Sequence, residues 1–310
     1  MAFGEYFMTR PPSEVESALA PWGENRAVLE LIGGPYAFSG LSPQQSRWIH
    51  EHLETFCNDS SAVTPVDETE VYRVSENLFK PIDVRGWEYT YERDYQLDHV
   101  RLAGLCFFGR VNLRPPFYGR LWTSATSPEN FEGVFENFLR VLVTYRIAAM
   151  GGILLHSAAI AKDGRAVVLV GISGAGKSTT SKLALEAGWE VLSDDLNALK
   201  PEGTAWTVEK VPFAGDLGST TTGARSYPLD GVFLLEKADR HGIVETSKAI
   251  LLARLLSCAP LLNEDPFRVD QALVTLNALV LALGRGTLQF ARDDGFLGLL
   301  MPNADKPNGN

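Results

Sequence analysis

One short segment constrains this chain more than any other, because an apolar strand, a glycine-rich loop and a helix follow one another directly. Residues 171–178 read GISGAGKS and fit the pattern G-x-x-x-x-G-K-[ST] at every fixed position. The apolar run RAVVLV leads into this loop, and residues 178–187 are the expected helix, ended by Gly188. This order is the context that the pattern requires, so the sequence predicts an α/β unit with an anion-binding loop.

The residue types of the loop suit a chain of phosphates. Glycines let the backbone curl so that several amides point inward, and the following helix adds its N-terminal dipole. Lys177 supplies a point charge for the β- and γ-phosphates, and the Ser178 hydroxyl is a ligand for Mg²⁺. The residues expected to bind a nucleotide are Gly171, Ser173, Gly174, Ala175, Gly176, Lys177, Ser178 and Thr179. A chance glycine-rich turn is the structural alternative.

Two adjacent carboxylates follow the loop closely. The segment WEVLS is the expected next strand, and it ends at Asp194 and Asp195. Ligands of open α/β sheets gather at the carboxyl ends of strands, so we expect both side chains near the last phosphate. Neighbours on a strand point to opposite sides, so the pair can divide two tasks, orienting a hydroxyl acceptor and ordering Mg²⁺. A solvated acidic turn is the structural alternative.

The N-terminal half predicts a separate module made mainly of strands. Residues 27–38 indicate two strands around a glycine break, and Ser42 with Gln45 forms a capping box that begins a helix. The segments VYRVS, WEYTYER, HVRLAGLCFFGRV and GRLWTS are rich in β-branched and aromatic residues and indicate an antiparallel sheet. A long helix is expected over residues 128–150, and its aromatic residues at helical spacing indicate core packing.

These patterns predict a fold of the α/β and α+β class with two domains. We expect a mixed, mainly antiparallel α+β domain over residues 1–127, the domain of the glycine loop over residues 128–302, and a disordered tail over residues 303–310. In the second domain we also expect strands WTVEKV and GVFLLEK, helices over residues 247–256 and 266–283, and a closing hairpin over residues 286–300.

Composition bears on the partners. The chain has 310 residues, is 45% hydrophobic and carries a net charge of −10 without a basic run, so we expect no attraction to nucleic acid or to an anionic membrane. Cys57, Cys106 and Cys258 are widely separated, which indicates thiols in a reducing compartment. Neither a signal-peptide pattern nor an apolar stretch long enough to span a bilayer is present, so we expect a cytoplasmic protein.

The combination of motifs resembles a known family. GISGAGKS, the SDD that follows it and the preceding LLHSAAIAKDG are similar to the catalytic domain of HPr kinase/phosphorylase. The segments VPFAGD and YPLDGVFLLEK make the chain more similar to the HPr-kinase-like proteins associated with ribosomal peptide maturation. The resemblance covers roughly residues 128–300. The loop reads GKST where HPr kinases commonly have GKSE. We therefore take the phosphoryl-transfer chemistry from the resemblance, but we do not take HPr as the acceptor.

The resemblance implies a P-loop serine kinase of peptides or small proteins that uses ATP and Mg²⁺. By this resemblance Asp194 is the catalytic base beside Lys177, and Asp195 helps to hold the metal together with Ser178. His156 matches a family histidine at the edge of the site, and Asp216 matches an acidic position that assists metal binding. From the residues alone, a core histidine and an acidic turn residue are the more usual interpretations of these two.

Three hypotheses stay open at this point. The first is a kinase for a Ser or Thr hydroxyl of a peptide or small protein. The second is a P-loop kinase for a small-molecule hydroxyl, which the same acid after the loop would serve. The third is a nucleotide-binding interaction module without phosphoryl transfer. The sequence leaves the acceptor, the nucleotide preference and assembly into a homo-oligomer undetermined.

Overall fold

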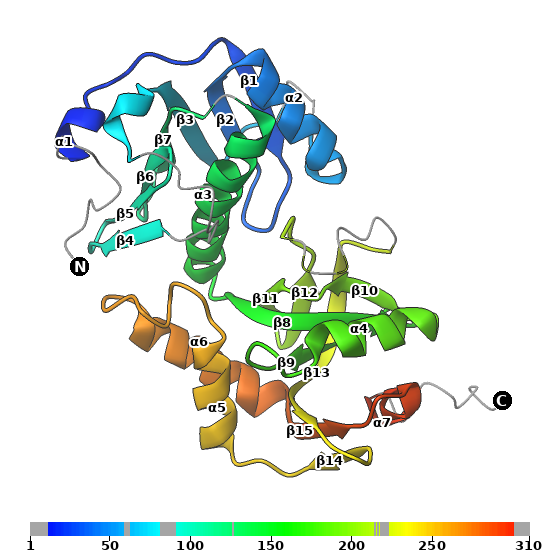
Figure 1. Cartoon of the computed structure of the whole chain (residues 1–310). Coiled ribbons are helices and arrows are strands. Elements are labelled where there is room, and N and C mark those ends of the chain that lie inside the picture. Colours follow the sequence, from blue (N-terminus) through cyan, green and yellow to red (C-terminus); the bar gives the residue numbers. More distant parts are fainter. Residues whose placement is uncertain are drawn as a thin grey trace. The chain divides into compact units, whose positions relative to one another are not determined.

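The chain has a mixed structure of β-sheets and helices. The computed structural model describes residues 12–58, 63–80, 91–125, 127–213, 215, 217 and 223–300 (Figure 1). The chain divides into two compact units, residues 1–146 and 147–310. The predicted disordered tail, residues 303–310, lies outside the described residues. Among the helices of the described residues, none is long and apolar enough to cross a membrane.

The first unit contains, within its described residues, a seven-stranded sheet in the order β1-β2-β3-β7-β6-β5-β4. Its strands are β1 (Asn25–Leu29), β2 (Tyr36–Leu41), β3 (Asp67–Arg73), β4 (Tyr91–Tyr95), β5 (His99–Gly104), β6 (Phe107–Asn112) and β7 (Phe117–Thr123). The helical segments before residue 80 are α1 (Pro12–Val15), α2 (Pro43–His52) and the 3₁₀ turns Glu54–Phe56 and Glu76–Leu78. The capping box of Ser42 and Gln45 is present at the start of α2, as predicted.

The sheet is less antiparallel than the sequence predicted. β4 to β7 form an antiparallel meander, but β3 is parallel to both of its neighbours, β2 and β7. The reason is the connection between β2 and β3, which carries α2 and therefore acts as a crossover rather than as a hairpin. The predicted strand WEYTYER begins among residues outside the described part, and β4 covers its end.

A long helix, α3 (Pro128–Ala149), belongs mostly to the first unit. The rings of Phe38 and Phe135 lie 4.8 Å apart, and a Cβ on Gly109 or Gly119 would come within 3.0 Å of Phe138. Arg146 forms a buried ion pair with Asp67 of β3. The division between the units therefore falls near the end of α3, between residues 146 and 147, and not at the predicted boundary between residues 127 and 128. Spacing identified the helix but could not show which sheet its aromatic face covers.

The second unit holds the glycine loop and, within its described residues, an eight-stranded sheet. Its strands are β8 (Ile153–Lys162), β9 (Arg165–Val170), β10 (Glu190–Ser193), β11 (Leu196–Glu202), β12 (Ala205–Glu209), β13 (Ser226–Lys237), β14 (Gly242–Val244) and β15 (Gly284–Phe290). Its helices are α4 (Lys177–Glu186), α5 (Lys248–Ser257), α6 (Val269–Leu283) and α7 (Leu297–Leu300), with a 3₁₀ turn at Asp294–Phe296.

Strand pairing places the loop next to the acidic segment. β9 pairs antiparallel with β8 on one side and parallel with β13 on the other, and β13 pairs parallel with β15. β10 and β11 both run antiparallel to β8. The carboxyl ends of β9, β13 and β15 therefore lie at one edge, one strand away from the junction of β10 and β11, and this arrangement positions the site described below.

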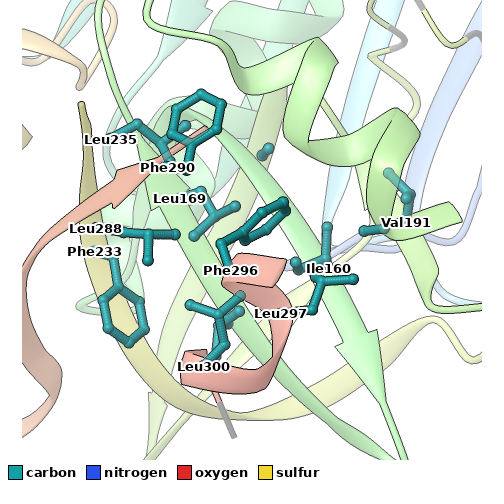
Figure 2. Close-up of a cluster of buried hydrophobic side chains, with 13 residues drawn as sticks. Ile160, Leu169, Val191, Phe233, Leu235, Leu288, Phe290, Phe296, Leu297 and Leu300 are labelled. Carbon is teal, nitrogen blue, oxygen red and sulfur yellow. The ribbon is translucent and has the colours of Figure 1, made fainter. Parts of the chain in front are cut away.

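The C-terminal segment completes the core of the second unit and corrects the predicted closing hairpin. β15 is parallel to β13 rather than half of a hairpin, and the chain continues into the 3₁₀ turn and α7. Phe296 and Leu300 are helically spaced apolar residues that enter the core beside Ile160 and Leu169 (Figure 2). The predicted second strand of the hairpin is helical instead, because a short apolar run such as FLGLL fits a helix as well as a strand.

We expect Phe296→Ala to lower the free energy of unfolding by about 3–5 kcal/mol, because it removes a fully buried ring from this core. Phe267→Ala is the matched control, because Phe267 is 50% exposed, and its loss should be below about 1 kcal/mol. Urea unfolding of both variants measures the difference. Equal losses would contradict a structural role for the C-terminal segment.

Candidate functional site: the glycine loop and the aspartate pair

The loop between β9 and α4 is tightly curled and requires glycine at several positions. Gly174 and Gly176 have positive φ values of 79° and 110°, which other residues adopt only at a cost. A Cβ on Gly176 would overlap the ring of Phe290. A Cβ on Gly171 would overlap the side chain of Ala175. The curl is thus fixed both by backbone conformation and by what packs beneath the loop.

Lys177 begins α4 and is held inside the loop. The residue is 7% exposed, and its Nζ donates a hydrogen bond of 2.8 Å to the carbonyl oxygen of Gly171. Burial lowers the pKa of Lys177, while electrostatic interactions with Cys258, Asp195 and Asp194 act in the opposite direction. A bound phosphate would offer this ammonium group a charged partner in place of a neutral carbonyl.

The aspartates lie at a bend between β10 and β11. Ser193 pairs with Ala159 and Leu196 pairs with His156, so the two strands follow β8 almost without interruption. Between them the chain bends at Asp194 and Asp195 instead of continuing as a regular strand.

The hydroxyl of Ser193 fixes this bend. Its Oγ accepts hydrogen bonds from the backbone N–H of Asp195 at 3.1 Å and of Leu196 at 3.3 Å. It also donates to the carbonyl oxygen of Phe213 at 3.1 Å, which ties a distant segment to the bend. On the β8 side, the backbone N–H of Ser157 donates to the carbonyl oxygen of Asp195 at 2.9 Å.

The two carboxylates have different surroundings. Asp194 is 4% exposed, and neither of its carboxylate oxygens accepts a hydrogen bond from the residues that the structure describes. The side chain of Asp195 is 26% exposed, and its Oδ1 lies 2.9 Å from Nδ1 of His156. Asp195 thus has His156 as a close polar neighbour, whereas Asp194 retains unused acceptor capacity.

Both aspartates border one cavity with the glycine loop. The cavity has a volume of about 370 Å³. Of the predicted residues, those that line it are His156, Ser173, Gly174, Gly176, Lys177, Ser178, Thr179, Asp194 and Asp195. The chain bends at Asp194 and Asp195, so the alternation of an extended strand, on which the expectation of opposite sides depends, does not apply there.

Two of the predicted residues, Gly171 and Ala175, do not line this cavity. Gly171 and Ala175 instead border a different cavity of about 330 Å³, below the start of the loop, together with Arg254 and Glu236. Asp216 lies outside the described residues. Its neighbour Gly215 lines the first cavity, and a Cβ on Gly215 would overlap the carboxylate of Asp194.

Sequence reasoning missed Gly215, Ser193 and Lys237 as functional positions. Lys237 ends β13 and lines the cavity, and the rule that ligands gather at the carboxyl ends of parallel strands could have identified it. Ser193 directly precedes the aspartates, and serine is a residue type that bonds nearby backbone N–H groups at bends. Gly215 belongs to the VPFAGD segment that carries the resemblance, but its own approach to Asp194 is a tertiary contact that the sequence does not show.

The donor set fits Mg²⁺ bound together with phosphates rather than a metal held by protein alone. Among the described residues, no group of three or more His, Cys, Asp or Glu side chains is arranged to hold a metal ion. Mg²⁺ is usually bound by one or two carboxylates, waters and substrate phosphates, so it does not need such a group. Ser178, Asp195 and the unpartnered oxygens of Asp194 line one cavity and suit this mode.

Comparisons with known proteins give limited similarity. Residues 125–262, less than half of the chain, match the family model described as "SynChlorMet cassette protein ScmC", a description that names no chemical activity. No curated protein matches the chain significantly. Among solved structures, the chain is weakly similar to the HPr(Ser) kinase/phosphatase from Coxiella burnetii. That match has 15% sequence identity and a TM-score of 0.22, and it covers 29% of this chain and 77% of the other.

We expect Gly176→Ala to destabilise the chain more than Gly174→Ala. Both substitutions carry the backbone cost of positive φ, about 1–2 kcal/mol. A Cβ on Gly174 meets nothing within 4 Å, whereas one on Gly176 overlaps Phe290, which should add about 1–3 kcal/mol. Urea unfolding measures both values, and combining Gly176→Ala with Phe290→Leu should recover part of the difference. Equal costs would show that Phe290 does not support the loop.

Proposed function

We propose that this chain is an ATP-dependent kinase that transfers the γ-phosphoryl group to a Ser or Thr hydroxyl of a peptide or small protein, with Mg²⁺. The observation that carries the proposal is the buried carboxylate of Asp194. Its oxygens accept no hydrogen bond from the described residues, and it borders the same cavity as Lys177 and Ser178. A buried charge without hydrogen bonds is costly, so it is typical of a group that acquires its partner on binding or in a reaction.

The loop supplies the binding part of the reaction. Inward amides and Lys177 would hold the β- and γ-phosphates, and the Ser178 hydroxyl would ligate the metal. Asp195, oriented by His156, would hold the metal through water or directly. Mg²⁺ bound there supplies neutralisation of the charge that develops on the phosphates.

Asp194 would act on the acceptor. Its carboxylate orients the incoming hydroxyl in line with the γ-phosphorus. The acceptor oxygen then forms a bond to that phosphorus, the bond to the β–γ bridging oxygen breaks, and ADP leaves with the electron pair. The hydroxyl proton passes to Asp194. Because a carboxylate is a far weaker base than an alkoxide, it mainly aligns the hydroxyl and takes the proton late.

The size of the cavity favours an acceptor presented from outside. A volume of about 370 Å³ lies at the small end of the range for ligand pockets, about 300–1,000 Å³. The phosphates and metal would occupy much of this space. A hydroxyl on a side chain can reach Asp194 from the mouth of the cavity without the rest of the acceptor entering it, which supports a peptide or small protein over an enclosed metabolite.

We expect Asp194→Asn to lower the rate of phosphoryl transfer by about 10²–10⁴-fold, because the amide cannot accept the proton. Nucleotide affinity should stay within a few-fold of the parent value.

Lys177→Ala should lower affinity for ATP by about 10- to 100-fold, because it removes a charge-assisted hydrogen bond to phosphate. Calorimetric titration with Mg-ATP measures the affinity. Mass spectrometry of peptides and small proteins encoded by neighbouring genes, incubated with the chain and Mg-ATP, measures the transfer.

Asp163→Asn is the matched control, because Asp163 lies in the turn between β8 and β9 with a φ of 52° that asparagine also tolerates. It should transfer phosphate normally. Normal transfer by Asp194→Asn would contradict the role of Asp194. ATP binding without phosphate gain on any peptide would favour a small-molecule acceptor or a non-catalytic module.

A further inference from the structure

A second cavity adjoins the cavity of the glycine loop, and neither Asp194 nor Asp195 lines it. It has a volume of about 570 Å³ and is lined by Thr179, Lys237, Asp239, Phe290 and Arg292 together with two alanines. Thr179 and Lys237 also line the first cavity, so the two cavities lie next to each other. His156, Asp194 and Asp195 border only the first of these two cavities.

The order of residues in the loop assigns a direction to a bound nucleotide. In loops of this pattern the lysine reaches the β- and γ-phosphates, while the backbone amides hold the α- and β-phosphates. The γ end is therefore expected beside Lys177 and the aspartates. The nucleoside end is then expected away from the aspartates. The second cavity, which shares Thr179 and Lys237 with the first and is not lined by Asp194 or Asp195, is the neighbouring space with that property.

The walls of the second cavity are built and held in place. They come from the carboxyl ends of the parallel neighbours β13 and β15, the position where ligands gather in such sheets. The backbone N–H of Ala238 donates to the carbonyl oxygen of Phe290 at 2.9 Å. The ring of His241 accepts at Nδ1 from the backbone N–H of Ala291 at 3.3 Å and donates from Nε2 to Asp293 at 2.6 Å.

The side chains at this cavity match the chemistry of a nucleoside. Phe290 is 2% exposed and forms part of its floor, beneath Gly176 of the loop. Arg292 is exposed, and a guanidinium plane can stack on a base. Asp239 is also exposed, and a carboxylate is the acceptor that suits the hydroxyls of a ribose. Lys237 stands where the two cavities meet and suits the phosphate nearest the ribose.

We propose that this second cavity binds the base and ribose of the nucleotide, with Asp239 on the ribose hydroxyls and Arg292 on the base. The inference rests on the proposed nucleotide site. The cavity below the start of the loop, bordered by Arg254 and Glu236, shares no lining residue with the first cavity and is not continuous with it.

Titration calorimetry with Mg-ATP and with inorganic tripolyphosphate tests the assignment, because tripolyphosphate needs only the first cavity. Asp239→Ala should lower affinity for ATP about tenfold, the loss of one good hydrogen-bonded contact to a charged group. The same change should leave tripolyphosphate binding unchanged or slightly tighter, because it removes a negative charge. With 2′,3′-dideoxy-ATP the loss should largely disappear. Glu236→Ala makes the same charge change at the cavity below the start of the loop, and it should not weaken ATP binding.

Arg292→Ala and Arg254→Ala form a second matched pair. Each removes one positive charge from an exposed position, so their effects on tripolyphosphate should be alike. Only Arg292→Ala should weaken ATP further, by about 3- to 10-fold. Equal losses for ATP and tripolyphosphate at Asp239 and Arg292, or no loss at either, would overturn the nucleoside assignment while leaving the proposed kinase intact. Failure of the unaltered chain to bind either ligand would overturn both.

Discussion

The hydrogen bonds of the Ser193 hydroxyl hold together the features on which this site depends. The hydroxyl oxygen accepts from the backbone N–H groups of Asp195 and Leu196, which keeps the chain bent between β10 and β11. The hydroxyl also donates to the carbonyl oxygen of Phe213, which ties that distant segment to the bend. The bend buries Asp194 at 4% exposure without a hydrogen-bonding partner among the described residues. Burial of an unpaired charge costs on the order of several kcal/mol. The surrounding structure must therefore be rigid enough to keep the Asp194 carboxylate in place.

The support of the glycine loop reaches deep into the second unit. Phe290 lies beneath Gly176 and stacks edge-on against Phe296, which the C-terminal segment inserts into the core (Figure 2). Arg292 lies just after the end of the strand that carries Phe290, and Lys237 and Asp239 lie at and just after the end of its parallel neighbour β13. The ends of β13 and β15 therefore both support the glycine loop, through Phe290, and border the space proposed for the nucleotide.

Local signals predicted much of this architecture. The strand, loop and helix around residues 171–178 and the capping box at Ser42 and Gln45 depend on residues close in sequence, and the structure has them. Tertiary relationships escaped prediction. Three features depend on segments that are distant in sequence. They are the parallel pairing of β3, the inclusion of most of α3 in the first unit, and the approach of Gly215 to Asp194. The helical C-terminus after β15 was missed because its short apolar run fits either a strand or a helix.

A crystal structure of the chain with Mg²⁺ and a non-hydrolysable ATP analogue tests the central claim, that the loop and Asp194 form one phosphoryl-transfer site. The account predicts the terminal phosphate beside Lys177. It also predicts that Asp194 lies at hydrogen-bonding distance, about 2.6–3.2 Å, from the water or hydroxyl that faces the γ-phosphorus. Phosphates bound away from the loop, or an Asp194 carboxylate that remains separated from that position by other side chains, would contradict it.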